Sequence, residues 1–156
     1  MINYRSAAAE DAPALADLGH ASFVDAFGHL YSSENLNRFL EQTYSLSNIE
    51  SELANPDRLF RIAERAGRMV GYCKLGFDAT LDHDSKGRRV MELKQLYMLG
   101  DETGSGIGAE LMTWALGEAH AREFDDIILS VWSENHAAQR FYARYGFEKI
   151  GDTIFM

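Results

Sequence analysis

A glycine-rich segment at residues 103–111 has the composition of an anion-binding turn. It reads Thr-Gly-Ser-Gly-Ile-Gly-Ala-Glu-Leu and leads into a stretch that we expect to be helical. Glycine lets the backbone approach a ligand closely, and the first amides of a helix have no hydrogen-bond partner within the helix. Because the helix dipole adds positive potential at the same place, such a turn binds anions. A pyrophosphate group suits this segment.

Other interpretations of this segment are a dinucleotide site, a Walker-type P-loop and a helix start without any ligand. Gly104, Gly106 and Ala109 satisfy the relaxed G-x-G-x-x-A spacing of dinucleotide-binding proteins. In those proteins the glycines follow the first strand of the domain, whereas here they stand far along the chain, and too little sequence follows for a dinucleotide fold. No Gly-Lys-Ser/Thr follows, which excludes a P-loop. The helix start without a ligand stays open.

The segment at residues 135–147 carries a second pattern. It reads Asn-His-Ala-Ala-Gln-Arg-Phe-Tyr-Ala-Arg-Tyr-Gly-Phe and follows an apolar, strand-like run. Its spacing, N-x-x-A-x-x-F-Y-x-x-x-G-F, resembles the C-terminal signature of the Gcn5-related N-acetyltransferase (GNAT) superfamily. The glycine turn is similar to the superfamily's acetyl-CoA pyrophosphate motif, and the two patterns occur in the family's order. The N-terminal half has a weaker likeness to spermine/spermidine N-acetyltransferases, at residues 22–28, 33–36, 52–56 and 71–75.

The resemblance implies an enzyme that transfers acetyl from acetyl-CoA to a primary amine. The amine attacks the thioester carbonyl directly, a tetrahedral oxyanion forms, and CoA leaves as a thiolate. A small cationic amine such as a polyamine is the acceptor that the likeness of the N-terminal half implies. The alternatives are acetylation of a protein N-terminus or lysine, a non-catalytic acyl-CoA-binding regulatory domain and, third, a nucleotide-binding domain.

The same resemblance implies where acetyl-CoA lies. The pantetheine arm follows the strand at Leu96, Tyr97 and Met98, and the backbone N–H of Met98 donates to the thioester oxygen. Asn135 bonds the pantetheine arm and can also cap the helix that it begins, and Ala138 follows in the same signature. The pyrophosphate lies on the backbone amides of the glycine turn, namely Gly104, Ser105, Gly106, Ile107, Gly108 and Ala109.

Two proton-transfer roles also follow from the resemblance. Tyr142 contacts the cofactor and is the candidate general acid, because a phenol near the sulfur can protonate the leaving thiolate; the alternative is that it packs a core face. Glu92 is the candidate general base, on a strand face that we expect to hold Lys94, Leu96 and Met98 as well. The alternative for Glu92 is an ion pair with Lys94 or an arginine. The histidines show no metal-ligand spacing, and no metal is expected.

The glycine turn departs from the superfamily pattern in its charge. Thr103 and Ser105 stand where basic residues are common, and Asp101 and Glu102 add negative charge beside the anion site. Phosphate binding is therefore expected to be weaker and to depend on backbone amides. The candidates to supply the missing positive charge are Arg122, Arg140 and Arg144.

The elements that must position these residues follow from the periodicity of apolar residues. Strands are expected at 2–5, 59–64, 69–77, 90–98, 127–132 and 147–150. Three helices are expected to begin near residues 11–13, at 32–33 and at 47, and two more to span 106–123 and 135–145. Residues 65–68 are expected to form a hairpin turn, and Ser47 with Glu50 has the spacing of a capping box. This order is typical of a mixed α/β fold. The resemblance implies a GNAT-like, mostly antiparallel sheet, splayed between its fourth and fifth strands, with helices on both faces.

The length of 156 residues fits one compact domain, and the composition is typical of a soluble globular protein. With the resemblance, we expect a single acetyltransferase domain over residues 1–156. The net charge of −9 repels phosphate backbones, so nucleic acid is not expected as a partner. The same charge attracts cationic small molecules, or serves only solubility. No membrane span, secretion signal or internal disulfide is expected, because no apolar run is long enough, the N-terminus lacks a signal pattern and Cys73 is the single cysteine. We therefore expect a cytoplasmic location, and a homodimer, common in the superfamily, would let the short C-terminus share a strand.

Overall fold

A computed structural model describes residues 2–27, 32–77, 87–99, 106–131 and 136–149. Five strands form one sheet in the order β1-β2-β3-β4-β5. The strands are β1 (Ile2–Ser6), β2 (Arg58–Arg65), β3 (Arg68–Gly76), β4 (Val90–Met98) and β5 (Asp126–Ile128). The helices are η1 (Ala9–Asp11, a 3-10 turn), α1 (Ala12–Phe27), α2 (Ser33–Tyr44), α3 (Leu46–Ala54), α4 (Ile107–Ala121) and α5 (His136–Ala143). None of the helices in these ranges is long and apolar enough to cross a membrane.

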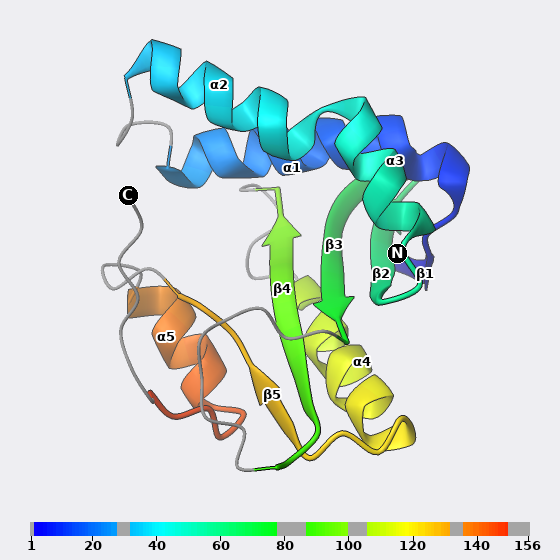
Figure 1. Ribbon diagram of the computed structural model, residues 1–156, viewed down its shortest axis with the longest axis vertical. Coiled ribbons are helices and arrows are strands. Elements are labelled where there is room, and N and C mark those ends of the chain that lie inside the picture. The colour runs from blue at the N-terminus through cyan, green and yellow to red at the C-terminus, as the bar shows by residue number, and fades with distance from the viewer. Residues whose placement is uncertain (1, 28–31, 78–86, 100–105, 132–135, 150–156) are drawn as a thin grey trace.

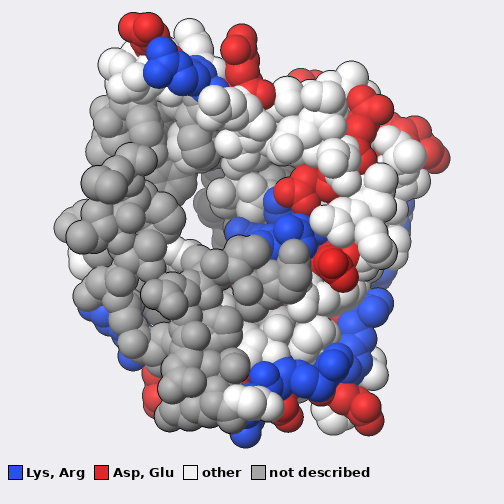
Figure 2. Space-filling model, viewed as in Figure 1, with Lys and Arg blue, Asp and Glu red and all other residues white. Residues whose placement is uncertain are grey.

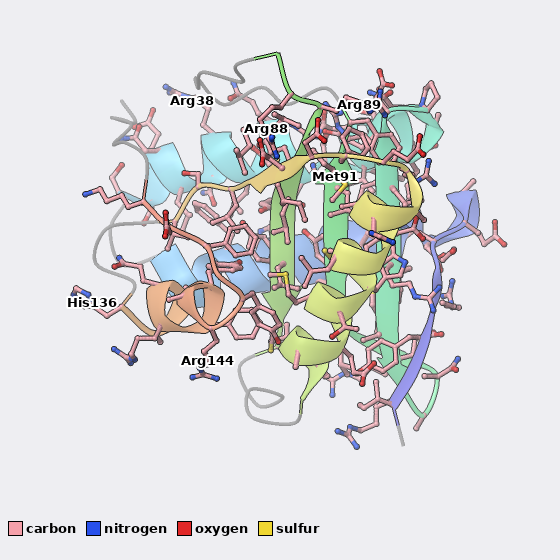
Figure 3. All side chains as sticks on the ribbon, turned by 90° about the horizontal axis from the view of Figure 1, so that it is seen from below. Arg38, Arg88, Arg89, Met91, His136 and Arg144 are labelled. Carbon is pink, nitrogen blue, oxygen red and sulfur yellow. The ribbon has the colours of Figure 1, made fainter. Side chains whose placement is uncertain are left out.

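Helices cover both faces of the sheet, as Figure 1 and Figure 3 show from two directions. β1 to β4 are antiparallel neighbours, and β5 joins β4 in parallel. One core forms between the sheet and α1, α2 and α3, and a second between the sheet and α4. α4 buries Leu111, Ala115 and Ala119 at the four-residue spacing of one helix face. The predicted mixed α/β sheet with helices on both faces is confirmed.

The two helices after α1 begin at serine caps. Ser32 Oγ accepts from the Asn35 backbone N–H at 3.2 Å, as expected for a helix that starts after residue 32. α3 begins two residues before the predicted capping box, because Ser45 rather than Ser47 is its N-cap and accepts from the Asn48 N–H at 3.3 Å. Ser45 is also the residue that ends α2, so a single extended residue links the two helices.

The hairpin between β2 and β3 has the predicted turn at residues 65–68. Ala66 and Gly67 both have positive φ, at 52° and 79°. Two central residues with positive φ define a type I′ turn, whose twist matches that of paired strands. The turn brings Arg65 opposite Arg68, and the pairing then continues to the far ends of both strands.

The end of the described chain differs from the prediction of a strand at 147–150. Residues 147–149 are not in a strand, and residue 150 lies outside the described part. The Phe147 N–H instead donates to the Tyr142 carbonyl at 3.3 Å and the Gly146 N–H to the Ala143 carbonyl at 3.0 Å. Gly146 has φ +89°. These bonds close the C-terminal turn of α5 and use the backbone donors that a strand would need.

The C-terminus of α4 has a residue in a conformation that favours glycine. The Phe124 N–H donates to Ala119 and the Glu123 N–H to His120, at 2.9 and 3.1 Å, and Glu123 has φ +60°. This is the Schellman arrangement, in which glycine is preferred at the left-handed position. The negative charge of Glu123 is also unfavourable here, because the C-terminal end of a helix dipole is itself negative.

Glu123→Gly is therefore expected to raise the free energy of unfolding by roughly 0.5–1 kcal/mol, measured by urea denaturation. Glu123→Ala is the matched control, because it removes the carboxylate and keeps the Cβ that strains this position. A glycine variant no more stable than the alanine variant would contradict the conformational explanation.

Candidate active site

A gap opens between β4 and β5 in the middle of the sheet. The two strands pair only from Val90 opposite Asp126 to Glu92 opposite Ile128, whereas β4 continues along β3 to Met98. Figure 1 shows the strands meeting at their lower ends and diverging upward. Beyond Glu92 no described strand pairs with this edge of β4. The predicted splay between the fourth and fifth strands is confirmed.

The backbone N–H of Met98 is directed toward this gap. The next amide, that of Leu99, donates to the Val70 carbonyl on β3 at 3.0 Å. Successive N–H groups of a strand point to opposite edges. The N–H of Met98 therefore lies on the edge away from β3, and that of Leu96 lies on the same edge two residues earlier. This is the orientation that the predicted hydrogen bond to a thioester requires.

A β-bulge interrupts β4 beside the gap. Lys74 on β3 lies opposite Gln95, but the next residue, Leu75, lies opposite Leu93. Lys94 is the extra residue between them. A bulge of this kind bends the strand and shifts the alternation of its side chains by one position.

The bulge corrects one prediction about β4. Leu96 and Met98 pack with the core beneath α4, whereas Tyr97 packs with the core beneath α1 and α2. Glu92 does face Lys94, but Leu96 and Met98 do not share that face, contrary to the prediction from simple alternation. The extra residue at Lys94 is the physical reason, because it reverses the parity of every later position.

Glu92, the candidate base, takes part in an ion pair. The Lys94 ammonium lies 3.2 Å from its carboxylate, and Glu92 is only 6% exposed. The pairing with Lys94, the alternative role of Glu92, is therefore present. A base role for Glu92 stays a prediction.

Further charged side chains, buried or half-buried, lie near this part of the sheet. Glu52 on α3 pairs with Arg58 at 3.0 Å and with Lys74 at 3.4 Å. Burial lowers the pKa of Lys74, and the nearby cations Arg58 and Lys94 lower it further, against the opposing effect of Glu52. Figure 2 shows basic side chains between acidic ones near the centre of the view, beside a hollow in the surface. Glu52 and Glu92 are thus both engaged by cations.

The first turn of α4 closes one end of the gap. Gly106 caps the helix with φ +88°, a conformation that favours glycine, while Ile107 and Gly108 are buried and Ala109 is exposed. Of the predicted pyrophosphate contacts, Gly104 and Ser105 lie outside the described residues.

Gly108 is the point where three elements meet. A Cβ added there would lie 3.1 Å from Met98 Cε and 3.5 Å from Phe141 Cζ. The start of α4, the end of β4 and helix α5 therefore come together, and glycine allows this close approach. The predicted phosphate turn, pantetheine strand and C-terminal signature are adjacent in space.

Tyr142 projects from α5 toward the same region. Its ring lies 5.3 Å from that of Phe141 and 5.8 Å from that of Phe147. Burial raises the pKa of Tyr142 well above its ordinary value, and the proximity of Cys73 on β3 and Tyr97 on β4 adds to the shift. The phenol is therefore protonated at neutral pH, which is the form that a general acid needs. Asn135 lies outside the described residues, and Ala138 is half-buried in the first turn of α5.

The structure separates the arginines proposed to supply positive charge. Arg122 lies at the C-terminal end of α4, paired with Glu118 at 3.0 Å, so it cannot assist a site at the first turn of that helix. Arg140 on α5 and Arg144, in the turn that follows this helix, are both exposed. Figure 3 shows Arg144 at the end of the molecule where α4 begins. The prediction for Arg122 is wrong, and Arg140 and Arg144 stay candidates.

Sequence reasoning assigned no role to Gln95 on β4. Its side chain bonds Tyr72 and Tyr44 on the α1 and α2 side of the sheet. A polar residue within an apolar strand was the available signal. The described residues contain no group of three or more side chains suited to a metal ion.

Comparisons with known proteins match this geometry. The acetyltransferase (GNAT) family model matches residues 23–147. An N-acetyltransferase of Mycobacterium bovis is 32% identical over 147 residues, covering 93% of this chain and 88% of the relative. The aminoalkylphosphonate N-acetyltransferase of Salmonella typhimurium is 28% identical over 141 residues, covering 90% of each chain. The crystal structure of the PaiA N-acetyltransferase from Thermoplasma acidophilum in complex with coenzyme A is similar with a TM-score of 0.82 and 25% identity, over 99% of this chain and 93% of that one. The predicted family and cofactor are confirmed: the chain belongs to the GNAT family of N-acetyltransferases, whose co-substrate is acetyl-CoA.

Proposed function

We propose that this enzyme acetylates the primary amine of a small molecule in the gap between β4 and β5. The observation that carries the proposal is the convergence of three features on this gap. The Met98 N–H points into it, the first turn of α4 closes one end, and Tyr142 reaches it from α5. Each feature supplies one requirement of acetyl transfer: an oxyanion donor, an anchor for the cofactor phosphates and a proton donor.

Acetyl-CoA fits the residues along this edge. The backbone of β4 at Leu96 and Met98 offers donors and acceptors that β5 does not use, so an extended arm can pair there like an added strand. The first amides of α4, which have no partner within the helix, suit the pyrophosphate, since Gly106, Ile107 and Gly108 place no polar side chain there. We propose the cofactor contacts Leu96, Tyr97, Met98, Gly104, Ser105, Gly106, Ile107, Gly108, Ala109, Asn135, Ala138 and Tyr142.

The proposed reaction moves one acetyl group and two protons, one from the amine to Glu92 and one from Tyr142 to the sulfur, and proton exchange with solvent then restores both side chains. The amine nitrogen attacks the thioester carbonyl, whose oxygen becomes an oxyanion held by the Met98 N–H. When the intermediate collapses, the carbon–sulfur bond breaks and Tyr142 gives its proton to the sulfur. An alkyl ammonium has a pKa of about 10.4, so only about one acceptor in 10³ is neutral at pH 7. Glu92, directly or through water, is the proposed acceptor of the amine proton.

Two classes of acceptor are compatible with the site. The net charge of −9 supports a cationic amine such as a polyamine, as the sequence predicted. A second class, an amine that also carries an anionic group, is favoured by the ion pairs of Glu52 and Glu92 with Arg58, Lys74 and Lys94. In that cluster the carboxylates are engaged, while Lys residues can rearrange to bind an anion. A relative named for aminoalkylphosphonate acetylation supports the same class.

An amine panel separates these classes. We expect thiol release from acetyl-CoA with at least one small primary amine among spermidine, 2-aminoethylphosphonate and a simple alkylamine. If the acceptor carries an anionic group, Lys94→Gln is expected to raise the KM for 2-aminoethylphosphonate by roughly 10- to 100-fold, which is the effect of losing one charge-assisted hydrogen bond. The KM for the alkylamine should not rise. Arg61→Gln on β2, two strands from β4, is the matched control.

The panel also tests the function itself. Acetyl-CoA-dependent thermal stabilisation without turnover of any amine would contradict the proposal and favour a regulatory acyl-CoA-binding role. Turnover only with peptides that present a free N-terminus or lysine would instead indicate a protein acceptor.

A further inference from the structure

The segment of β4 beside the gap is supported along one edge only. β3 pairs with it as far as Met98, but β5 ends its pairing at Glu92. The bulge at Lys94 weakens the ladder just before this segment. A strand held at one edge and bulged at its base needs another constraint if its backbone N–H is to keep a fixed position.

A chain of hydrogen bonds ties this segment to the rest of the fold. The Tyr72 hydroxyl donates to Gln95 Oε1 at 2.8 Å, and Gln95 Nε2 donates to the Tyr44 hydroxyl at 3.4 Å. The Tyr44 and Tyr97 hydroxyls are hydrogen-bonded to each other. The chain thus runs from β3 to β4, on to α2 and back to β4.

The members of this chain are packed as well as bonded. Tyr72 and Tyr44 are 2% and 6% exposed, and the rings of Tyr72 and Tyr97 meet edge to face at 5.7 Å. Phe23 on α1 lies 6.3 Å from Tyr44. Removing one polar partner here leaves others buried without a hydrogen bond, which favours a shift of the backbone that carries them.

The two residues of the chain on β4 lie directly beside the reacting edge. Gln95 is the first residue after the bulge, and Tyr97 immediately precedes Met98. Their side chains point to the α1 and α2 side, while the Met98 N–H lies in the plane of the sheet at its open edge. A clamp on these side chains therefore fixes the backbone without entering the space of the cofactor.

We propose that Gln95 and Tyr44 are positioning residues, which hold the open edge of β4 through the hydrogen-bond chain Tyr72–Gln95–Tyr44–Tyr97 so that the Met98 N–H meets the thioester oxygen. The proposal rests on the proposed function of Met98. It assigns to the tyrosines of this core a role in kcat that buried packing alone does not require.

The test uses two variants that preserve shape. Tyr44→Phe removes only a hydroxyl, and Gln95→Met replaces the amide by an apolar chain of similar length. We expect kcat to fall about tenfold or more in each, because small misplacements of catalytic groups have effects of this size, with the Kd for acetyl-CoA changed by less than about threefold. The double variant is expected to lose no more than the worse single variant, since both act through one chain. Tyr4→Phe on β1 is the matched control and should keep wild-type kcat.

Hydrogen exchange of the full-length protein provides a readout that does not depend on turnover. Acetyl-CoA is expected to protect the amides of residues 96–98 in the wild type, and this protection is expected to weaken in Tyr44→Phe and Gln95→Met. Unchanged kcat in both variants would overturn the proposal, as would a loss confined to the Kd or unchanged protection at residues 96–98. A wild-type enzyme that binds acetyl-CoA but acetylates no amine would contradict the proposed function. In that case the exchange measurement still decides whether the hydrogen-bond chain holds this edge of β4.

Discussion

Replacing Tyr142 by phenylalanine is expected to lower kcat by about 10²- to 10⁴-fold, the usual contribution of a general acid. The change removes one oxygen and leaves the ring in contact with Phe141 and Phe147. Stability and the Kd for acetyl-CoA should therefore change little. The loss arises because the thiolate must then leave without a proton from the enzyme.

The matched control is Tyr145→Phe, the same change just after the end of α5. The Tyr145 ring packs on that of Phe141, with the ring centroids 5.2 Å apart. We expect this variant to keep kcat within a few-fold of the wild type. Steady-state kinetics with a thiol reagent measure both. Full activity of Tyr142→Phe, or an equal loss in the two variants, would remove Tyr142 from the mechanism.

The role of Tyr142 as general acid also predicts how the rate depends on pH. Burial raises the pKa of Tyr142, so the phenol stays protonated beyond its ordinary pKa of about 10. The acceptor amine loses its proton as pH rises toward its own pKa. The rate should therefore increase from pH 7 to 9 and should show no decline in that range from ionisation of Tyr142.

The second large effect is expected for Met98→Pro. Proline removes the backbone N–H, and removal of one oxyanion donor typically lowers kcat by about 10²- to 10³-fold. We expect the strand to accept proline at this position, because this N–H faces the gap and makes no bond to β3. Proline is accepted in strands at such edge positions.

Two control variants separate the loss of the Met98 N–H from other effects of the substitution. Met98→Leu keeps the N–H and a similar volume, so its effect on kcat should be far smaller than that of proline. Leu99→Pro removes the donor of the 3.0 Å bond to Val70 and should instead lower the melting temperature. If Met98→Pro folds, binds acetyl-CoA and keeps kcat, the oxyanion donor must lie elsewhere.

Much of the scaffold could be predicted from local sequence. The hairpin at residues 65–68 has the turn residues that its geometry needs, and Gly106 allows the sharp entry into α4. The likeness at residues 135–147 led to the correct family and to the splayed sheet. These features depend on residues close together in the chain.

The face of β4 could not be predicted by strict alternation. Met91 and Leu93 are followed by Leu96 and Met98, all in one core, so the apolar spacing of two changes once to three. That interval was the sign of the bulge. The cap of α3 at Ser45 was missed for a similar reason, because Ser47 has equally suitable spacing and only the packing of Tyr44 fixes where α2 ends. The homodimer and the cytoplasmic location stay predictions.

The most direct test of the account is the amide signal of Met98 during titration with acetyl-CoA. The chain has six methionines, so labelling with ¹⁵N-methionine gives a simple spectrum, and Met98→Leu identifies the signal. A new hydrogen bond to the thioester oxygen should shift the Met98 amide proton downfield with acetyl-CoA and much less with CoA, which lacks the acetyl carbonyl. An unchanged Met98 signal in protein saturated with acetyl-CoA would contradict the placement of the thioester at this edge of β4.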